Sequence, residues 1–586
     1  MYLSPTTHKC SIQILTNHTG YEKNGPKRAI LVTPDGKVQD NIVYLVSLID
    51  NKPIAELPLG KATKIAKWPQ GYFHHIDFSH IKRQGRYIIS AGRACSQPFT
   101  IQANLLFEQT HSDVLHYFKS QRCSGVFDRH DHRAQVLESE QYIDVHGGWY
   151  DASGDMSKYL SHLSYSNYFN PQQTPIVVWN LIRSLKLLEP TSVLTFQSKR
   201  RFVDEALHGA DFLLRMQSKQ GYFYLTVFDQ WSKKTSQREI CAFSHQIGQK
   251  SAEFHAGFRQ GGGIAIASLA AASRLEDRGD FDSTDYLKGA EQGYWHLKEY
   301  NHLYIDDGQE NIIDHYCALI ASVELYKSTH NDRYLTEARL WCRQLMEKQQ
   351  CDDNFAHFWS VDNTTTRPFY HPVEAGLPTI ALCEYIEVES DKPLSEQARC
   401  ILENAVKFEV NITTKVANVF GYPRQYIKPI NGIKKDAFFM AQSNETLYWW
   451  QGENARLSSL STMAFFSHSH IQSPDLKEQL LDYAQNSLNW VLGLNPYNVC
   501  MLDGHGVNNC DYLPQQGFYN AKGGICNGIT AGIADDETIA FNPAEYQDDM
   551  TQNWRWSEQW LPHAAWYLLA ISAQVAHYFP TNLVSE

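Results

Sequence analysis

The hydrophobic pattern of this chain changes its period once, near Ala103, and the change separates two kinds of structure. Between Ser11 and Ile101, short runs rich in β-branched and aromatic residues alternate with turn signals such as Pro34-Asp35-Gly36. This spacing predicts a small β-sandwich over residues 1–103. After Ala103, apolar residues recur every three or four positions to the end of the chain, and this period predicts helices.

The helical part, residues 104–586, contains twelve segments with a helical pattern. In one of them Phe202, Ala206, Ala210 and Leu213 form a single apolar stripe. A solenoid would need a fixed sequence repeat, and this chain has none. The twelve helices therefore predict six helical hairpins closed into a ring, an all-α (α/α)6 toroid. The segments are 104–122, 174–188, 199–218, 256–277, 281–300, 311–328, 331–350, 373–388, 393–412, 444–469, 474–494 and 562–579.

Long segments without a helical pattern interrupt the series, and loops of such length usually carry function. The connection from Ile101 into the helix near Leu105 is only a few residues long. We therefore expect the two domains to share an apolar interface. The long segments are 123–173, 220–255, 351–372, 413–443 and 495–556.

Charge and hydropathy limit the partners that this chain can have. Its 52 Lys and Arg against 64 Asp and Glu give a net charge of −12 without long basic runs, which disfavours nucleic acid. No stretch approaches about 18 consecutive apolar residues, so we expect no membrane partner. Met1 to Ile12 lacks a cationic segment followed by an apolar one, and this predicts a cytoplasmic protein.

Cysteine and aromatic residues narrow the chemistry further. The twelve cysteines stand singly, without a Cys-x-x-Cys pair, which predicts reduced thiols and neither a disulfide framework nor a zinc site. The 14 Trp, 32 Tyr and 28 Phe suit the flat faces of sugars, and they equally suit core packing.

The first candidate site is Gly147-Gly148-Trp149-Tyr150-Asp151-Ala152-Ser153-Gly154-Asp155. Asp151 and Asp155, four residues apart on a turn loosened by glycines, can point at one small volume. A turn whose Asp side chains only cap backbone N–H groups explains the same residues.

The second candidate site precedes the last helix, at Trp554-Arg555-Trp556-Ser557-Glu558-Gln559-Trp560-Leu561-Pro562. Pro562 suits the first turn of a helix, so Glu558 lies in the loop just before it. The neighbouring Trp554, Trp556 and Trp560 can surround this carboxyl with apolar surface and raise its pKa. The helix N-terminus has the opposite effect, and an exposed Glu at a helix start is the alternative.

Together these motifs resemble glycoside hydrolase family nine, which carries a Gly-Gly-Trp-x-Asp-Ala-Gly-Asp loop and an Asn-Glu pair before its last helix. Further similar segments lie at Asp211–Gln217, Asn454-Ala455-Arg456 and Gly493-Leu494-Asn495-Pro496. The opening Asn17-His18-Thr19-Gly20-Tyr21 resembles the immunoglobulin-like domain that precedes the toroid in one branch of the family. The resemblance therefore implies an N-terminal immunoglobulin-like β-sandwich followed by an (α/α)6 catalytic toroid.

The resemblance also implies an inverting β-glycosidase, in which one carboxylic acid protonates the leaving oxygen and a carboxylate activates water. Matched residue by residue, Asp155 corresponds to the base, Asp151 to the second Asp that helps to hold the water, and Glu558 to the general acid. We expect no cofactor and no catalytic metal, since histidines such as His74-His75 and His130 with His132 lack a third ligand at standard spacing.

Three departures from the family pattern bear on the sugar. Ser153 is an extra residue between the two Asp, and Ser557 replaces the Asn before the acid. The family's cellulases grip glucose hydroxyls with a His and Arg pair after the Asn-Pro motif, whereas this loop reads Asp503-Gly504-His505-Gly506-Val507-Asn508-Asn509-Cys510-Asp511-Tyr512. One branch of the family with this domain order contains exo-β-glucosaminidases, and the resemblance together with these departures implies such an enzyme, which releases glucosamine from the non-reducing end of short chitosan-type oligosaccharides.

The ammonium group of glucosamine would need carboxylate partners, because a buried charge without a partner is costly. The candidates are Asp503 and Asp511 on the altered loop, Asp144 before the first motif and Asp549 before the acid. The other residues that we expect to contact the sugar are Trp149, Tyr150, Trp449, Trp450, His505 and Trp554.

Two other interpretations remain open at this point. The first is a β-glucosidase or endoglucanase of the same family acting on cellodextrins or other β-glucans. The second is a catalytically inactive sugar-binding protein, which the joint presence of Asp151, Asp155 and Glu558 argues against. The sequence leaves a structural calcium, the number of subsites and the oligomeric state undetermined.

Overall fold

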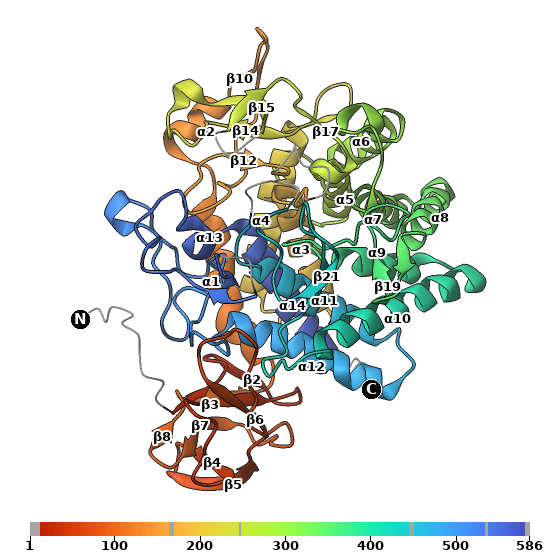
Figure 1. Cartoon of the computed structure of the whole chain (residues 1–586). Helices are drawn as coiled ribbons and strands as arrows, with labels where there is room; N and C mark the ends of the chain where they lie inside the picture. The colour runs from red at the N-terminus through yellow and green to blue at the C-terminus, as the bar shows by residue number, and fades with distance from the viewer. Residues whose placement is uncertain (1–11, 163–168, 245–247, 445–449, 534–536, 580–586) are drawn as a thin grey trace.

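Short strands occupy the first hundred residues and form two facing sheets (Figure 1). In the computed structural model, which describes residues 12–162, 169–244, 248–444, 450–533 and 537–579, one sheet has the order β1-β3-β6 and the other β2-β9-β7-β4-β5, with β8 beside β7. The strands are β1 (Gln13–Leu15), β2 (Gly20–Glu22), β3 (Arg28–Thr33), β4 (Ile42–Ser47), β5 (Lys52–Pro58), β6 (Tyr72–Asp77), β7 (Gly85–Ala91), β8 (Ala94–Cys95) and β9 (Phe99–Gln102).

Strand β3 shows how the sandwich is attached to the rest of the chain. Its Ala29 and Leu31 face the core between the two sheets, whereas Ile30 and Val32 face the helical domain. Because both faces of this strand are buried, its sequence is a continuous apolar run without alternation.

The interface between the sandwich and the helical domain is apolar, as we expected from the short connection. Trp68 is 1% exposed, and its ring lies 5.1 Å from that of Phe438 and 6.1 Å from that of Trp490. Polar contacts surround this centre: the Asn17 side-chain amide donates to Asn489 at 3.0 Å. The sandwich therefore packs closely against the toroid.

The helices form two concentric layers. The inner helices contact each other in the closed order α3-α5-α7-α9-α11-α14-α3, and the outer helices α1, α4, α6, α8, α10 and α12 pack around them. The bounds are α1 (Leu105–Gln121), α2 (Gly125–Asp131), α3 (Thr174–Leu188), α4 (Phe196–Arg215), α5 (Gly263–Ala272), α6 (Ser283–Tyr304), α7 (Ile312–Thr329), α8 (Asp332–Met346), α9 (Leu377–Val388), α10 (Lys392–Thr414), α11 (Asn454–His468), α12 (Pro474–Val491), α13 (Trp554–Ser557) and α14 (Leu561–Tyr578). This ring confirms the predicted fold class.

Burial explains the difference in sequence between the two layers. Every residue of α5 is buried, so this helix is apolar on all sides. Outer helix α4 instead buries one stripe that includes Phe202, Ala206, Ala210 and Leu213, as its sequence predicted, and exposes its charged face. Central helices of a ring must be apolar all round, and outer helices need only one apolar face.

The segments between the helices build a second, six-stranded sheet at the top of Figure 1. It has the order β11-β10-β15-β14-β12, with β16 beside β15. Since β12 follows directly after Asp155, this sheet fixes one end of the loop that carries the two Asp. Its strands are β10 (Ala134–Val136), β11 (Tyr142–Ile143), β12 (Lys158–Tyr159), β14 (Thr226–Phe228), β15 (Glu239–Ser244) and β16 (Gln249–Ser251).

All twelve predicted helical segments contain a helix, with two notable differences at their starts. The segment predicted at 256–277 is helical only over α5, because Gly261 adopts φ +97° and a wide turn fills Phe258–Gly262. In the segment predicted at 444–469, helix α11 begins at Asn454, and residues 445–449 lie outside the described residues. In the part of the chain that the structure describes, no helix combines the length and apolarity needed to cross a bilayer.

The buried interface predicts a large stability effect for Trp68→Ala. Removing a buried Trp leaves a cavity and should lower the free energy of unfolding by about 3–5 kcal/mol. Ile49→Ala, on the same domain at a side chain that is 80% exposed, is the control and should cost about 0.5 kcal/mol or less. Urea unfolding measures both, and equal losses would show that the interface carries no special stability.

Candidate active site

The two motifs singled out in the sequence lie side by side and pair as a short antiparallel seam. Ala152 and Trp560 form a β-bridge, and the Ser153 amide donates to the Gln559 carbonyl at 2.9 Å. The Gln559 amide in turn donates to the Ser153 hydroxyl at 3.0 Å. Ser153, the extra residue of the first motif, therefore makes the contacts that align this loop with the chain beside Glu558.

Gly154 provides the space in which Glu558 lies. Its amide donates to Glu558 Oε1 at 3.1 Å. A Cβ atom at this position would lie 2.5 Å from the same oxygen and 2.8 Å from the Tyr512 ring, so any side chain would displace the carboxyl. The Tyr512 hydroxyl is the second hydrogen-bond partner of Glu558.

The surroundings of Glu558 favour its protonated form. Loss of solvent around this carboxyl raises the pKa of Glu558 well above its usual value, and the charges of Asp155 and Asp151 raise it further. The Gly154 amide and the Tyr512 hydroxyl act in the opposite direction but do not outweigh these effects. Glu558 is thus suited to hold a proton near neutral pH.

Asp155 is 6% exposed and accepts hydrogen bonds at both oxygens. Its Oδ1 accepts from the Ser157 amide at 2.8 Å, and its Oδ2 accepts from the Tyr159 hydroxyl at 2.6 Å and from Trp231 Nε1 at 3.0 Å. Burial and the charge of Asp151 raise the pKa of Asp155, while Tyr159 and Ser157 favour the charged form. Three donors thus hold this carboxylate in one orientation.

Asp151 lies where two inner helices begin. Its Oδ1 accepts from Gln173 Nε2 at 2.5 Å, directly before α3, and its Oδ2 accepts from Trp560 Nε1 at 2.8 Å, directly before α14. His162 Nε2 lies 3.1 Å from the same Oδ2. Three side-chain atoms lie within 4.8 Å of one another here: a carboxylate oxygen of Asp151, a carboxylate oxygen of Asp155 and a ring nitrogen of His162. The two helix N-termini and their dipoles therefore favour negative charge at this point.

A fully buried ion cluster fixes the loop that carries both Asp. The Lys158 ammonium donates to the carbonyls of Val145 and Gly147 at 2.7 and 2.9 Å and pairs with Asp131 at 2.7 Å. Arg238 pairs with Asp131 at 2.7 Å from the other side. Burial alone would raise the pKa of Asp131, but these two cations outweigh it and lower the pKa. The cluster ties the start of the loop to its end.

The aromatic residues expected to stack on sugar have different environments. Trp149 is fully buried, and its Nε1 donates to Glu205 at 3.3 Å, so it packs in the core. Trp450 is 9% exposed and lies under the Arg555 guanidinium. Tyr150 is partly exposed and bonds to Ser124. Trp449 lies outside the described residues.

Trp554 lies beside a hydrogen-bond partner of Glu558. It is partly exposed and packs against a small cluster of Tyr512, Leu513 and Phe518. Because Tyr512 is a hydrogen-bond partner of Glu558, this cluster connects Trp554 to the carboxyl.

The polar residues expected at the sugar are mostly engaged elsewhere. His505 Nε2 pairs with Asp113 at 2.8 Å, Asp144 pairs with His146 at 2.6 Å, and Asp549 caps Thr551. Asp511 is exposed. Burial and the charge of Asp511 raise the pKa of Asp503. None of the hydrogen bonds identified among the described residues joins these side chains to Asp151, Asp155 or Glu558.

Several residues around the carboxylates were missed by sequence reasoning. Ser157 and Tyr159 follow Asp155 within four residues, so their proximity could have been inferred. Trp231 and Asp229 come from the long segment 220–255, which the sequence identified only as a whole. The remaining ones are His162, Gln173 and Tyr512, which reach the site only through the fold.

One cluster outside this site could hold a metal ion. His132, Asp144 and His146 offer three ligand atoms within 4.8 Å of one another, around the paired strands β10 and β11. Sequence spacing did not indicate this group, because Asp144 and His146 join His132 only across the hairpin.

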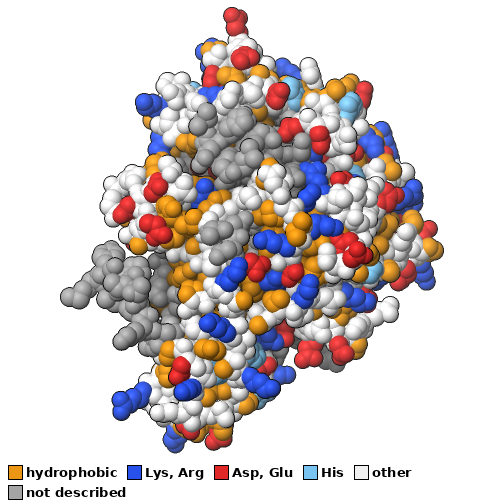
Figure 2. All heavy atoms as spheres, in the orientation of Figure 1, with side chains coloured by type: hydrophobic (Ala, Val, Ile, Leu, Met, Phe, Trp, Pro, Cys, Tyr) orange, Lys and Arg blue, Asp and Glu red, His pale blue; other side chains and the backbone are white. Residues whose placement is uncertain are grey.

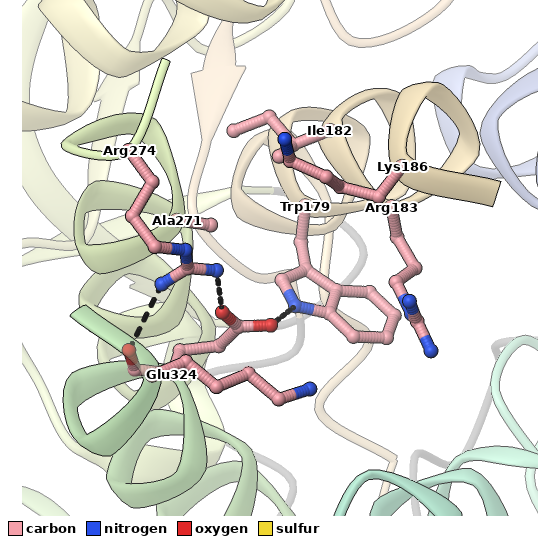
Figure 3. Close-up of a pocket in the computed structure, with 8 residues that line it drawn as sticks. Trp179, Ile182, Arg183, Lys186, Ala271, Arg274 and Glu324 are labelled. Atoms are coloured by element: carbon pink, nitrogen blue, oxygen red, sulfur yellow. Dashed lines mark hydrogen bonds and ion pairs between the residues drawn. The ribbon is translucent and has the colours of Figure 1, made fainter. Parts of the chain in front are cut away.

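A separate pocket of about 180 Å³ lies toward the C-terminal ends of α3, α5 and α7, away from Gln173 at the start of α3 (Figure 3). In Figure 3, Glu324 accepts from Trp179 Nε1 at 3.0 Å and pairs with Arg274. Arg183 and Lys327 each pair with Glu384. The charges of this pocket are compensated within the protein, and Asp151, Asp155 and Glu558 do not line it.

The surface carries both charge signs. On the face drawn in Figure 2, acidic and basic side chains of the described residues are interspersed. This mixture agrees with a net charge of −12 that is spread along the chain.

Comparisons with known families match both domains. The family model described as "Glycosyl hydrolase family 9" matches residues 107–560. The model described as "Cellulase N-terminal ig-like domain" matches residues 10–96. Together they match most of the sandwich, and the toroid up to the residue before α14.

Similar proteins support the fold. Endoglucanase C of Cellulomonas fimi is 28% identical over 185 residues, which cover 25% of this chain and only 16% of the length of that curated relative. A metagenome-derived glycoside hydrolase family 9 endoglucanase has a TM-score of 0.65 at 17% identity, covering 96% of this chain and 99% of that one. A Bacteroides ovatus GH9 structure has a TM-score of 0.64 at 17% identity, with 97% and 99% covered. AaCel9A in complex with cellobiose-like isofagomine has a TM-score of 0.64 at 15% identity, with 96% and 99% covered.

The raised pKa of Glu558 predicts a pH-dependent stability difference. Between the ordinary pKa of Glu and the raised one, the folded state binds more protons than the unfolded state, so stability falls as pH rises. Glu558→Gln removes this loss. The melting temperature of the variant minus that of the unmodified protein should therefore increase as the pH rises from roughly 5 to 8.

Glu389→Gln is the control for this measurement. Although burial opposes it, hydrogen bonds from Arg339 lower the pKa of Glu389 to about 2. The gap between this variant and the unmodified protein should stay constant over the same pH range, because Glu389 does not titrate there. A constant gap for Glu558→Gln as well would contradict its raised pKa.

Proposed function

This chain belongs to glycosyl hydrolase family 9, and from that membership we propose that it hydrolyses β-linked oligosaccharides of the glucan type. The family is one of inverting O-glycosidases, which place a general acid and a general base on opposite sides of the scissile bond. The carboxylates gathered at the seam between Ala152 and Trp560 are suited to these two roles.

In the proposed reaction, Glu558 donates its proton to the glycosidic oxygen as the bond from that oxygen to the anomeric carbon breaks. A water molecule attacks the opposite face of this carbon, and Asp155 takes the proton from the water. Asp151, held by Gln173 and Trp560, helps to fix the water. The products are a sugar with inverted configuration at its anomeric carbon and the rest of the oligosaccharide, which leaves as an alcohol.

The observation that carries the proposal is the unequal hydrogen bonding of the two carboxyls. Asp155 accepts from three donors, which favour its charged form, and its pKa is raised. Glu558 has a pKa well above its usual value and accepts from the Gly154 amide and the Tyr512 hydroxyl. Environments that separate the protonation of two carboxyls assign the acid and the base.

The names of the similar proteins suggest cellodextrins and related β-glucans as substrates of this chain. The curated relative and the metagenome-derived structure are both named endoglucanases, and AaCel9A was solved with a cellobiose-like compound. We propose glucose-containing β-oligosaccharides as the first substrates to be tested.

Glucosamine-containing oligosaccharides are the second candidate, and the clustering of carboxylates supports them. Asp151, Asp155 and Glu558 lie in one region, and the two aspartates are close enough to Glu558 for their charges, together with burial, to raise its pKa. Such a concentration of acidic groups attracts a cationic amino sugar. An exo-acting enzyme of this kind would release glucosamine from the non-reducing end.

Three disaccharides distinguish these substrates. We expect turnover of cellobiose or of the glucosamine dimer, and little of the dimer with an N-acetylated non-reducing sugar, because acetylation removes the charge and adds bulk. Product release measured by anion-exchange chromatography decides between the first two. A clear preference for the acetylated dimer would contradict both candidates, and inactivity on every β-oligosaccharide would favour a sugar-binding protein.

The assignment of acid and base predicts the behaviour of three variants. Glu558→Gln and Asp155→Asn should each lower kcat on an unactivated disaccharide by about 100- to 10,000-fold, and Asp151→Asn should be less severe. Proton NMR of fresh product should show the α-anomer released from a β-linkage. Early appearance of the β-anomer would show retention and remove the role given to Asp155.

A further inference from the structure

A fully buried carboxylate that the proposed mechanism does not use lies behind Asp155. Asp229 Oδ1 accepts from the Ser157 hydroxyl at 3.0 Å and from the Trp231 amide at 3.1 Å. The same two residues donate to Asp155, Ser157 through its amide at 2.8 Å and Trp231 through Nε1 at 3.0 Å. Asp229 and Asp155 are therefore joined by two shared donors.

The backbone that presents Trp231 is strained. Gln230, Trp231 and Lys233 all adopt positive φ, at 59°, 55° and 56°. Residues with side chains rarely adopt this region and stay there only when their surroundings hold them. The Asp229 carboxylate bonds to the amide two residues on, an Asx turn, and the Ser232 hydroxyl donates to the Asp229 carbonyl at 2.6 Å. Asp229 thus holds the turn that aims the Trp231 indole at Asp155.

Asp229 is also one negative charge among several. Burial and the charge of Asp155 raise the pKa of Asp229, and Arg238 opposes this. Within the described residues, Asp229 Oδ2 is buried and makes no hydrogen bond. The titratable groups that face Asp155 and Asp229 are Asp151, Tyr159, His162, Lys233, Arg238, Tyr512 and Glu558.

We propose that Asp229 is a positioning residue for Asp155, which it orients through Trp231 and Ser157 and whose readiness to accept a proton it sets by its charge. The inference rests on the proposed function, in which Asp155 is the base. Asp229 does not contact substrate in this arrangement, because it is fully buried.

Substitutions at Asp229 and Trp231 act on Asp155 in opposite directions. Asp229→Asn keeps an oxygen that can accept from the Trp231 amide but removes the charge, so ionisation of Asp155 becomes easier. Trp231→Phe removes an N–H donor that stabilises the charged form, so ionisation becomes harder. Asp229→Ala removes both the charge and the support of the turn.

The experiment is the pH profile of kcat/KM on the best disaccharide, whose acid limb reports the ionisation of the base in the free enzyme. We expect the acid limb to move by about one pH unit to lower pH in Asp229→Asn and to higher pH in Trp231→Phe. In Asp229→Ala we expect kcat to fall by roughly tenfold or more beyond its value in Asp229→Asn.

Asp211→Asn is the matched control, because burial also raises the pKa of this carboxyl, which bonds to Tyr286 away from the site. Its acid limb should not move. Acid limbs that coincide in Asp229→Asn and the unmodified enzyme would overturn the role of Asp229 in tuning the base. Unimpaired activity of Asp155→Asn would instead overturn the proposed function, so the two failures can be distinguished.

Discussion

The seam between two distant segments is the constraint on which the site depends. The Ser153 amide donates to the Gln559 carbonyl, and the Gln559 amide donates to the Ser153 hydroxyl. This pairing places Gly154 against the Glu558 carboxyl. A glycine is required there because a Cβ atom would lie 2.5 Å from Glu558 Oε1. The carboxyls at the seam are buried away from water, so the charges of Asp151 and Asp155 act strongly on Glu558. The same few contacts therefore set both the geometry and the protonation of the carboxyls.

The fold could be predicted from the sequence because its signals are local. The change of period near Ala103 separated strands from helices, and the apolar stripes located each of the twelve helical segments. Strand β5 contains two prolines and two charged residues, Lys52 and Glu56, so its sequence carries only a weak strand signal. The start of α5 was misplaced because a positive φ at Gly261 cannot be read from an apolar pattern.

The surroundings of the site were harder to predict, because they depend on contacts between distant segments. Trp149 and Trp231 are alike as residues, yet one is a buried core residue that donates to Glu205 and the other donates to Asp155. Nothing within either local sequence separates these roles. The acidic residues around the motifs, such as Asp549, show the same difficulty, since a charge next to a motif can point away from it.

Because the ring closes through its last helix, the order of synthesis determines when the site can form. Gly154 and Glu558 are 404 residues apart, and α14, which follows Glu558, is the helix that joins α11 to α3. A nascent chain folds from its N-terminus as it leaves the ribosome, but it lacks both Glu558 and this helix until residues 558–578 have been synthesised. A chain that stops before Glu558 would therefore have an open ring and only one side of the seam.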